Sequence, residues 1–309
     1  MTLRKILVPL DGSPFCEHAL PHAASIARRT GARLILAHVQ PPATTFISID
    51  SQSALTPYEE SDVEQSMKAY LDKTAAALRP ITGGAVSTAY RTGHIVDTLC
   101  ELIHSEGIDL VTITTHGRGS LSRMWLGSIA SELTQRSPIP LLLTRPTETP
   151  SELHADVVPR RILIPLDGSP FAEKAIPLAF SFGSAVGSSP ATIYRLLQVV
   201  PPVLTTASIK EHSILAASPT VADELRTQAE AYFRDLTQRM PTLQHAETHV
   251  AVDWPAANAI LQDAQTHAAD YIAMTTHGRT GISRLFLGSV ADKVVRGATI
   301  PVLLTRPST

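Results

Sequence analysis

One internal repeat constrains the fold of this chain more than any other feature. The segment Lys5–Phe15 (KILVPLDGSPF) recurs as Arg161–Phe171 (RILIPLDGSPF), with seven consecutive identities. A second shared segment, Thr-Thr-His-Gly followed after nine residues by Gly-Ser, starts at Thr114 and again at Thr275. Two long segments that recur in the same order indicate the duplication of a whole structural unit.

The length of the chain agrees with a duplication. A chain of 309 residues corresponds to two domains of ~150 residues each. We predict a first domain at residues 1–146, a linker at 147–159 and a second domain at 160–309. Apolar residues make up 44% of the chain and charged residues 17%, which is typical of globular domains with well-filled cores.

The charge and hydropathy patterns argue against nucleic-acid and membrane partners. The formal net charge is −2, and lysine and arginine are spread along the chain, so no basic patch would attract nucleic acid or anionic lipid. No apolar run approaches the ~18 residues of a membrane-spanning helix. Because Pro9 and Asp11 interrupt the N-terminal apolar run, no signal peptide is indicated and a cytoplasmic protein is expected. Cys16 and Cys100 lack a Cys-x-x-Cys spacing and are interpreted as buried thiols.

Each copy alternates short apolar strands with amphipathic helices. In the first copy, strands are expected at 6–8, 33–39, 86–90, 108–113 and 139–144. Helices are expected to begin near Ser13, Glu59, Ile95 and Ser128, and the second copy repeats this order. This alternation predicts two Rossmann-like α/β domains, each a five-stranded parallel sheet with helices on both faces and right-handed crossovers.

Local signals predict where several helices begin and end. Ser13 and Ser169 each precede a proline and are expected to be helix N-caps. The helix after Ser169 is expected to end near Gly183. Pro80 and Pro241 are expected to end the long second helix of each copy, because proline removes a backbone donor.

The Thr-Thr-His-Gly and Gly-Ser segments predict an anion site in each copy. Thr-Thr-His-Gly follows a buried strand, and the chemistry of open sheets gathers at the carboxyl ends of strands. Gly-Ser begins a helical pattern, so Ser128 and Ser289 are expected at a helix N-cap with free backbone N–H groups beside them. Glycine turns at a strand end and a helix start together predict a cradle for a negatively charged group. Capping alone is the alternative role for both serines.

Together these segments resemble the universal stress protein family. The features that carry the resemblance are a first strand ending in Pro-x-Asp, a second strand ending near Val39 or Val199, and a closing Pro-x-Leu-Leu strand. Before the closing strand comes a Gly-x-x-Gly-x9-Gly-Ser/Thr signature and a helix. All four landmarks occur in the same order in both copies. The resemblance covers nearly all of each copy. This chain departs from the signature at its first glycine, which is Thr114 in one copy and Thr275 in the other.

The resemblance implies an adenine-nucleotide site, for ATP or AMP, in each domain. The aspartate after the first strand would contact the ribose, the valine would meet adenine through backbone groups, and the later glycines and serine would hold the phosphates. The arginine after His-Gly suits bidentate contact with phosphate oxygens, and a solvent-exposed loop arginine is its alternative role. The predicted site comprises Asp11, Val39, Thr114, Gly117, Arg118, Gly127 and Ser128 in the first domain, and Asp167, Val199, Thr275, Gly278, Arg279, Gly288 and Ser289 in the second.

Three functions remain open from the sequence. The leading one is a nucleotide-binding regulatory protein of the stress response. A slow nucleotide hydrolase or adenylyl-transfer enzyme is the second, although the chain has no Gly-x-x-x-x-Gly-Lys-Ser/Thr loop and no evident carboxylate beside His116 or His277. An interaction scaffold whose sites are blocked by Thr114 and Thr275 is the third.

No protein-held metal site is indicated, and Mg²⁺ would arrive with the nucleotide. Asp11 and Asp167 have a purely local alternative role, as turn residues.

The closing strands bear on assembly. Leu141–Thr144 and Val302–Leu304 are apolar sheet edges that must be covered. In the family such edges commonly pair, which implies that the two domains form a pseudo-dimer within one chain. The sequence leaves a further homodimer open.

Overall fold

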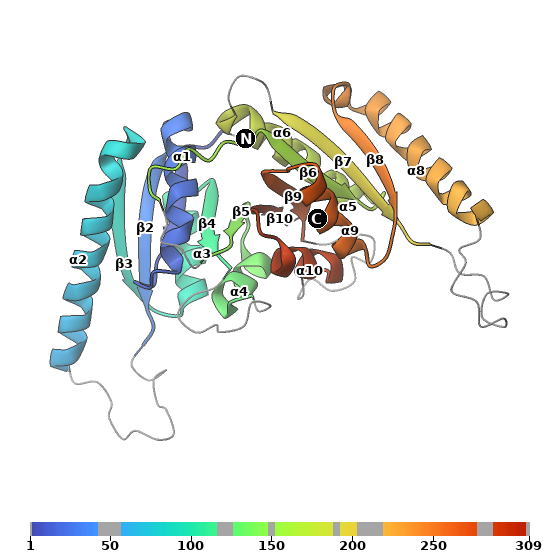
Figure 1. Cartoon of the computed structure of the whole chain (residues 1–309). Coiled ribbons are helices and arrows are strands. Elements are labelled where there is room, and N and C mark those ends of the chain that lie inside the picture. Colours follow the sequence, from blue (N-terminus) through green and yellow to red (C-terminus); the bar gives the residue numbers. More distant parts are fainter. Residues whose placement is uncertain are drawn as a thin grey trace, which may run out of the picture. The chain divides into compact units, whose positions relative to one another are not determined.

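The computed structural model describes residues 2–42, 57–115, 126–147, 152–187, 192–202, 219–276 and 287–306 (Figure 1). The chain divides into two compact units, Met1–Val158 and Pro159–Thr309. Each unit is an α/β domain built on a five-stranded parallel sheet, which confirms the predicted fold class.

Domain 1 contains five strands in the order β3-β2-β1-β4-β5. Its elements along the chain are β1 (Lys5–Pro9), a 3₁₀ helix η1 (Cys16–Ala19), α1 (Leu20–Thr30), β2 (Arg33–Gln40), α2 (Pro57–Thr82), β3 (Val86–Thr92), α3 (Ile95–Glu106), β4 (Leu110–Thr114), α4 (Ser128–Arg136) and β5 (Leu141–Thr144). Helix α1 packs beside α2, and α3 packs beside α4.

Domain 2 repeats this topology with the order β10-β9-β6-β7-β8. Its elements are β6 (Arg161–Leu166), α5 (Pro170–Glu173), α6 (Ala175–Val186), β7 (Ile193–Val200), α8 (Pro219–Arg239), a 3₁₀ helix η3 (Pro241–Leu243), β8 (Glu247–Val252), α9 (Ala256–Thr266), β9 (Tyr271–Thr275), α10 (Ser289–Gly297) and β10 (Val302–Thr305). The register is also repeated, since Lys5 pairs with Arg33 and Arg161 with Ile193.

The central strands are covered on both faces, which explains their continuous apolar sequences. Every residue of β4 and of β9 is buried. Strands of a parallel sheet lack a solvent face because the crossover helices pack on both sides, so alternation of polar and apolar residues is lost.

Two predicted helix boundaries are wrong. Pro80 lies inside α2, which continues to Thr82. Ile81 and Thr82 are buried, so their packing in the core outweighs the backbone hydrogen bond that proline removes one turn from the helix end. In domain 2, α6 continues past Gly183 to Val186.

The start of the first helix differs between the domains. Ser169 is an N-cap as predicted, and its Oγ accepts a hydrogen bond from the Ala172 N–H at 3.2 Å. In domain 1, the corresponding contact from the Cys16 N–H to Ser13 Oγ is longer, at 3.4 Å. The chain there forms the 3₁₀ helix η1 first, and α1 begins only at Leu20.

The last part of the predicted linker belongs to domain 1. Asp156 pairs with Arg28 and Arg29 of α1, and the Arg29 Nη2–Asp156 Oδ2 distance is 2.6 Å. Ser25 Oγ donates to the Val157 carbonyl at 3.0 Å and accepts from the Val157 N–H at 3.1 Å.

Among the described residues, no helix combines the length and the apolar content needed to cross a membrane.

Candidate functional site

The carboxyl ends of the central strands define the candidate site in each domain. The strand order reverses between β1 and β4 in domain 1, and between β6 and β9 in domain 2. At such a switch point the connections after the two strands run to opposite faces of the sheet, and a crevice opens between them.

An Asp-Gly-Ser turn follows the first strand on one side of this crevice. Asp11 Oδ1 accepts a hydrogen bond from the Ser13 N–H at 2.9 Å, and Asp167 Oδ1 accepts one from the Ser169 N–H at 2.9 Å. The intervening glycine has a left-handed backbone in both copies, with φ of 77° at Gly12 and 82° at Gly168. Both aspartates therefore have the turn role, and this role fixes each carboxylate at the strand end.

The Thr-Thr pair lies on the other side of the crevice and is tied to the following helix. The Thr115 N–H donates to the Thr144 carbonyl at 2.8 Å, and the Thr115 carbonyl accepts from the Gly127 N–H at 2.7 Å. Domain 2 repeats both contacts, from the Thr276 N–H to the Thr305 carbonyl at 3.0 Å and from the Gly288 N–H to the Thr276 carbonyl at 2.8 Å. These bonds bring the Gly-Ser segment to the end of the central strand, as the anion-cradle interpretation requires.

The predicted N-cap position of the two serines is wrong by one residue. Gly127 and Gly288 are the N-caps, and Ser128 and Ser289 are the first residues of α4 and α10. The Gly127 carbonyl already accepts the Ser131 N–H at 2.8 Å, so the glycine is the last residue outside the helix. Being glycines, these two N-cap residues have no side chain with which to cap their helices. The first backbone N–H groups have no acceptor within the helix, which makes this end attractive to an anion.

A cavity of about 250 Å³ lies at the switch point of domain 2. All five described residues of the predicted second site line it, namely Asp167, Val199, Thr275, Gly288 and Ser289. Leu197, Ile260 and Met274 add an apolar lining. The cavity therefore joins an apolar surface to a carboxylate, to threonine and serine residues and to a helix N-terminus. Thr275 borders this space and does not fill it.

Domain 1 has equivalent positions, and one of its differences from domain 2 introduces a thiol. Cys16 stands where the cavity of domain 2 has Ala172, a substitution that alignment of the two copies reveals. Its thiol is buried, donates to the Ser13 carbonyl at 3.0 Å and lies 3.9 Å from Tyr70 Oη. Burial, and then the nearby negative charge of Asp11, raise the pKa of the Cys16 thiol to about 11. A neutral thiol is the result.

Some predicted residues cannot be placed. Gly117, Arg118, Gly278 and Arg279 lie outside the described residues, as do His116 and His277. The described parts of the chain contain no cluster of three or more His, Cys, Asp or Glu side chains that could hold a metal ion.

Tandem doubly wound domains, each with a candidate site at its strand switch point, define the class of this protein. The family model described as the universal stress protein family matches residues 2–145 and 159–306. The chain therefore belongs to the universal stress protein family and carries one family domain in each half.

Relatives align along almost the whole chain. A universal stress protein of Mycolicibacterium smegmatis is 25% identical over 305 residues, covering 98% of this chain and 97% of the relative. One of Mycobacterium tuberculosis is 27% identical over 325 residues, covering 97% and 94%. Both relatives are thus of similar length to this chain.

Solved structures share the fold. A universal stress protein from Archaeoglobus fulgidus superposes with a TM-score of 0.67 at 16% identity, covering 98% of both chains. A functionally unknown protein from Pseudomonas aeruginosa gives 0.65 at 19% identity, covering 99% of this chain and 93% of that one. At these identities the likeness concerns the fold alone.

Proposed function

We propose that the protein binds an adenine nucleotide, ATP or AMP, at the switch point of each domain and acts as a regulator of the stress response in the cytoplasm. The observation that carries this proposal is the cavity of domain 2, where all five described residues of the predicted site meet. Nucleotide occupancy would then alter the conformation or the choice of partner.

Each part of the cavity suits one part of a nucleotide. The Asp167 carboxylate can accept hydrogen bonds from ribose hydroxyls while its Oδ1 keeps the turn contact to Ser169. Backbone groups of Val199 can recognise adenine beside the apolar lining. The N-terminal amides of α10, together with the Ser289 hydroxyl, can hold phosphate oxygens. In domain 1, Asp11, Val39 and Ser128 have the corresponding roles.

The cavity formed by the described residues is small for a nucleotide. Its volume of about 250 Å³ lies just below the ~300–1,000 Å³ range of small-ligand pockets. We propose that Gly278 and Arg279 complete the phosphate side, with Gly117 and Arg118 in domain 1, and that Mg²⁺ accompanies the nucleotide.

The direct test is to identify what the purified protein carries. Small molecules released by denaturing freshly purified protein are analysed by mass spectrometry, and calorimetric titrations with ATP, AMP and GTP follow. We expect an adenine nucleotide in the released fraction and a preference for ATP or AMP over GTP. If no nucleotide is released and none binds at millimolar concentration, the proposal is wrong and a scaffold without ligand is favoured.

A variant separates the ribose contact from the turn contact. Asp167→Asn keeps an oxygen that can accept the Ser169 N–H and removes the negative charge. Because hydrogen bonds to charged groups are roughly twice as strong as neutral ones, we expect about tenfold weaker binding at the second site with unchanged folding. Asp223→Asn, an exposed position on α8, is the matched control.

We also propose that the two domains pair within the chain through β5 and β10. Both strands are short and apolar, and each is the last strand of its own domain's sheet beside β4 or β9. An uncovered apolar edge would promote aggregation. Slow amide exchange along both strands in dilute, monomeric protein would support this arrangement, and fast exchange at either strand would exclude it.

A further inference from the structure

The long helices α2 and α8 carry opposite charges at equivalent positions. Tyr70 of α2 and Tyr232 of α8 make the same contact, each donating a hydrogen bond to a glutamate at the start of its domain, at 3.0 Å and 3.2 Å. Aligning these tyrosines places Glu64, Lys68 and Asp72 (the α2 stripe) opposite Arg226, Glu230 and Arg234 (the α8 stripe). The sign of the charge is reversed at all three positions.

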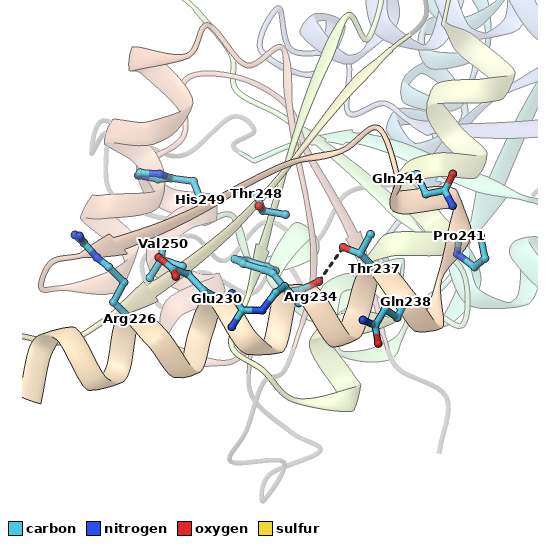
Figure 2. A pocket seen from close by; sticks show the side chains of 11 residues that line it. Arg226, Glu230, Arg234, Thr237, Gln238, Pro241, Gln244, Thr248, His249 and Val250 are labelled. Atoms are coloured by element: carbon cyan, nitrogen blue, oxygen red, sulfur yellow. Dashed lines mark hydrogen bonds between the residues drawn. The ribbon is translucent and has the colours of Figure 1, made fainter.

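The α8 stripe lines an open groove of about 850 Å³ between α8 and β8. Figure 2 shows Arg226, Glu230 and Arg234 on successive turns of α8, with Thr248 and Val250 on the neighbouring strand. All three charged residues are exposed, and none of them makes an ion pair or hydrogen bond within the described part of the chain. The described part of the chain therefore leaves the charges of the α8 stripe to be matched by another molecule.

The equivalent groove of domain 1, between α2 and β3, is smaller, at about 330 Å³. Asp72 accepts a hydrogen bond from Thr88 at 3.1 Å, and Lys68 Nζ lies 5.5 Å from the centre of the Tyr90 ring. Lys68 also pairs with Glu64 at 2.5 Å, with both side chains about half exposed. Exposed pairs of this kind contribute little to stability. They can therefore be exchanged for contacts with a second surface at little cost.

Helix stabilisation alone does not account for the two stripes. Opposite charges four residues apart stabilise a helix when they pair, and Glu64 and Lys68 do so in α2. In α8, Arg226 before Glu230 is the less favourable order and Glu230 before Arg234 is the favourable one, and neither pair is formed within the described part of the chain. Pairing along the helix therefore does not engage the charges of the α8 stripe.

We propose that the α8–β8 edge of one molecule docks the α2–β3 edge of a second copy of this chain. Lys68 would meet Glu230 at the centre whichever way the helices run, and Glu64 and Asp72 would meet the two arginines. An acidic peptide fits less well, because Glu230 would repel it at the centre of the groove. Strands β3 and β8 each end the strand order of their own domain, so their outer backbone groups can add hydrogen bonds between the two sheets.

Sedimentation equilibrium with two complementary variants tests the proposal. The first is Arg226→Glu with Arg234→Glu, and the second is Glu64→Arg with Asp72→Arg. We expect the wild-type chain to self-associate at low salt and to dissociate as salt rises, because the contact is electrostatic. Each variant alone should associate at least tenfold more weakly. An equimolar mixture of the two should regain association, because each variant supplies the partner stripe that the other needs.

The control is Arg33→Glu with Arg160→Glu, which changes the net charge as the first variant does but at exposed positions outside both stripes. It should associate like the wild type, and circular dichroism should confirm that all variants are folded. A wild-type chain that stays monomeric at every concentration overturns the proposal. So does association that persists unchanged in both variants, or a mixture that stays as weak as its components.

Discussion

Arg195 of β7 and Asp263 of α9 form a bidentate ion pair inside domain 2. The Nε–Oδ2 distance is 2.8 Å and the Nη2–Oδ1 distance is 3.0 Å, with side chains only 9% and 6% exposed. Glu247 adds a contact to Arg195 Nη1 at 3.2 Å. Domain 1 has Ile35 and Leu102 at the equivalent positions, both buried. One packing site is thus filled by an ion pair in one copy and by two aliphatic side chains in the other.

Breaking this ion pair should cost far more than replacing it. Asp263→Ala leaves the Arg195 guanidinium buried with only the half-exposed Glu247, and we expect domain 2 to lose about 3–5 kcal/mol of unfolding free energy. The double variant Arg195→Ile with Asp263→Leu introduces the residues of domain 1, and we expect it to lie within about 1 kcal/mol of the wild type, or above it. Native-state hydrogen exchange at β7 and α9 measures both. Equal losses of unfolding free energy in the single and the double variant would contradict the expectation that an unpaired buried charge is the main cost.

The linker contact should depend on acid pH. The hydrogen bond from Arg29 is the main cause that holds the pKa of Asp156 below its ordinary value. A lowered folded-state pKa gives stability that is complete above the unfolded value of ~3.9 and is lost as pH falls through the folded pKa. Because Asp156 is about half exposed, Asp156→Asn should reduce the unfolding free energy by less than about 1 kcal/mol at pH 7, and this deficit should shrink below pH ~4.

Urea denaturation of both proteins across this pH range checks the expectation. Glu152→Gln, on the same segment, is the control and should show no such pH-dependent deficit. A deficit for Asp156→Asn that grows as the pH falls would mean that the carboxylate does not stabilise the linker.

The two cysteines should differ in reactivity. Burial raises the pKa of both thiols, and for Cys16 the value is about 11, so about one molecule in a thousand carries that thiolate at pH 8. Cys16 is also buried, whereas Cys100 is partly exposed. Iodoacetamide should therefore label Cys100 first, as followed by peptide mass spectrometry. In Cys100→Ser protein, labelling of Cys16 should require unfolding, and rapid labelling in the native state would refute the buried, neutral thiol.

The fold was predictable because its signals are local and occur twice. Apolar runs such as Leu110–Thr114 identify buried strands, and the repeated Asp-Gly-Ser turn marks the end of β1 and β6. The lining by Leu197 and Met274 was not predictable, because it depends on which strands become neighbours. The position of Pro80 inside α2 was not predictable for a similar reason, since it follows from the burial of Ile81 and Thr82, which depends on tertiary packing.

Two serines of domain 2 should respond differently to the same substitution. Ser169 is an N-cap whose Oγ accepts the Ala172 N–H at 3.2 Å, so Ser169→Ala should cost about 1 kcal/mol of unfolding free energy. Ser289 follows the N-cap Gly288 and does not cap α10, so Ser289→Ala should cost less than about 0.5 kcal/mol. If Ser289 instead contacts phosphate, as proposed, the same variant should weaken nucleotide binding severalfold while stability is kept. Urea denaturation measures the stability of each variant, and calorimetric titration measures its nucleotide binding. If Ser289→Ala loses as much stability as Ser169→Ala, the Ser289 hydroxyl caps α10 after all.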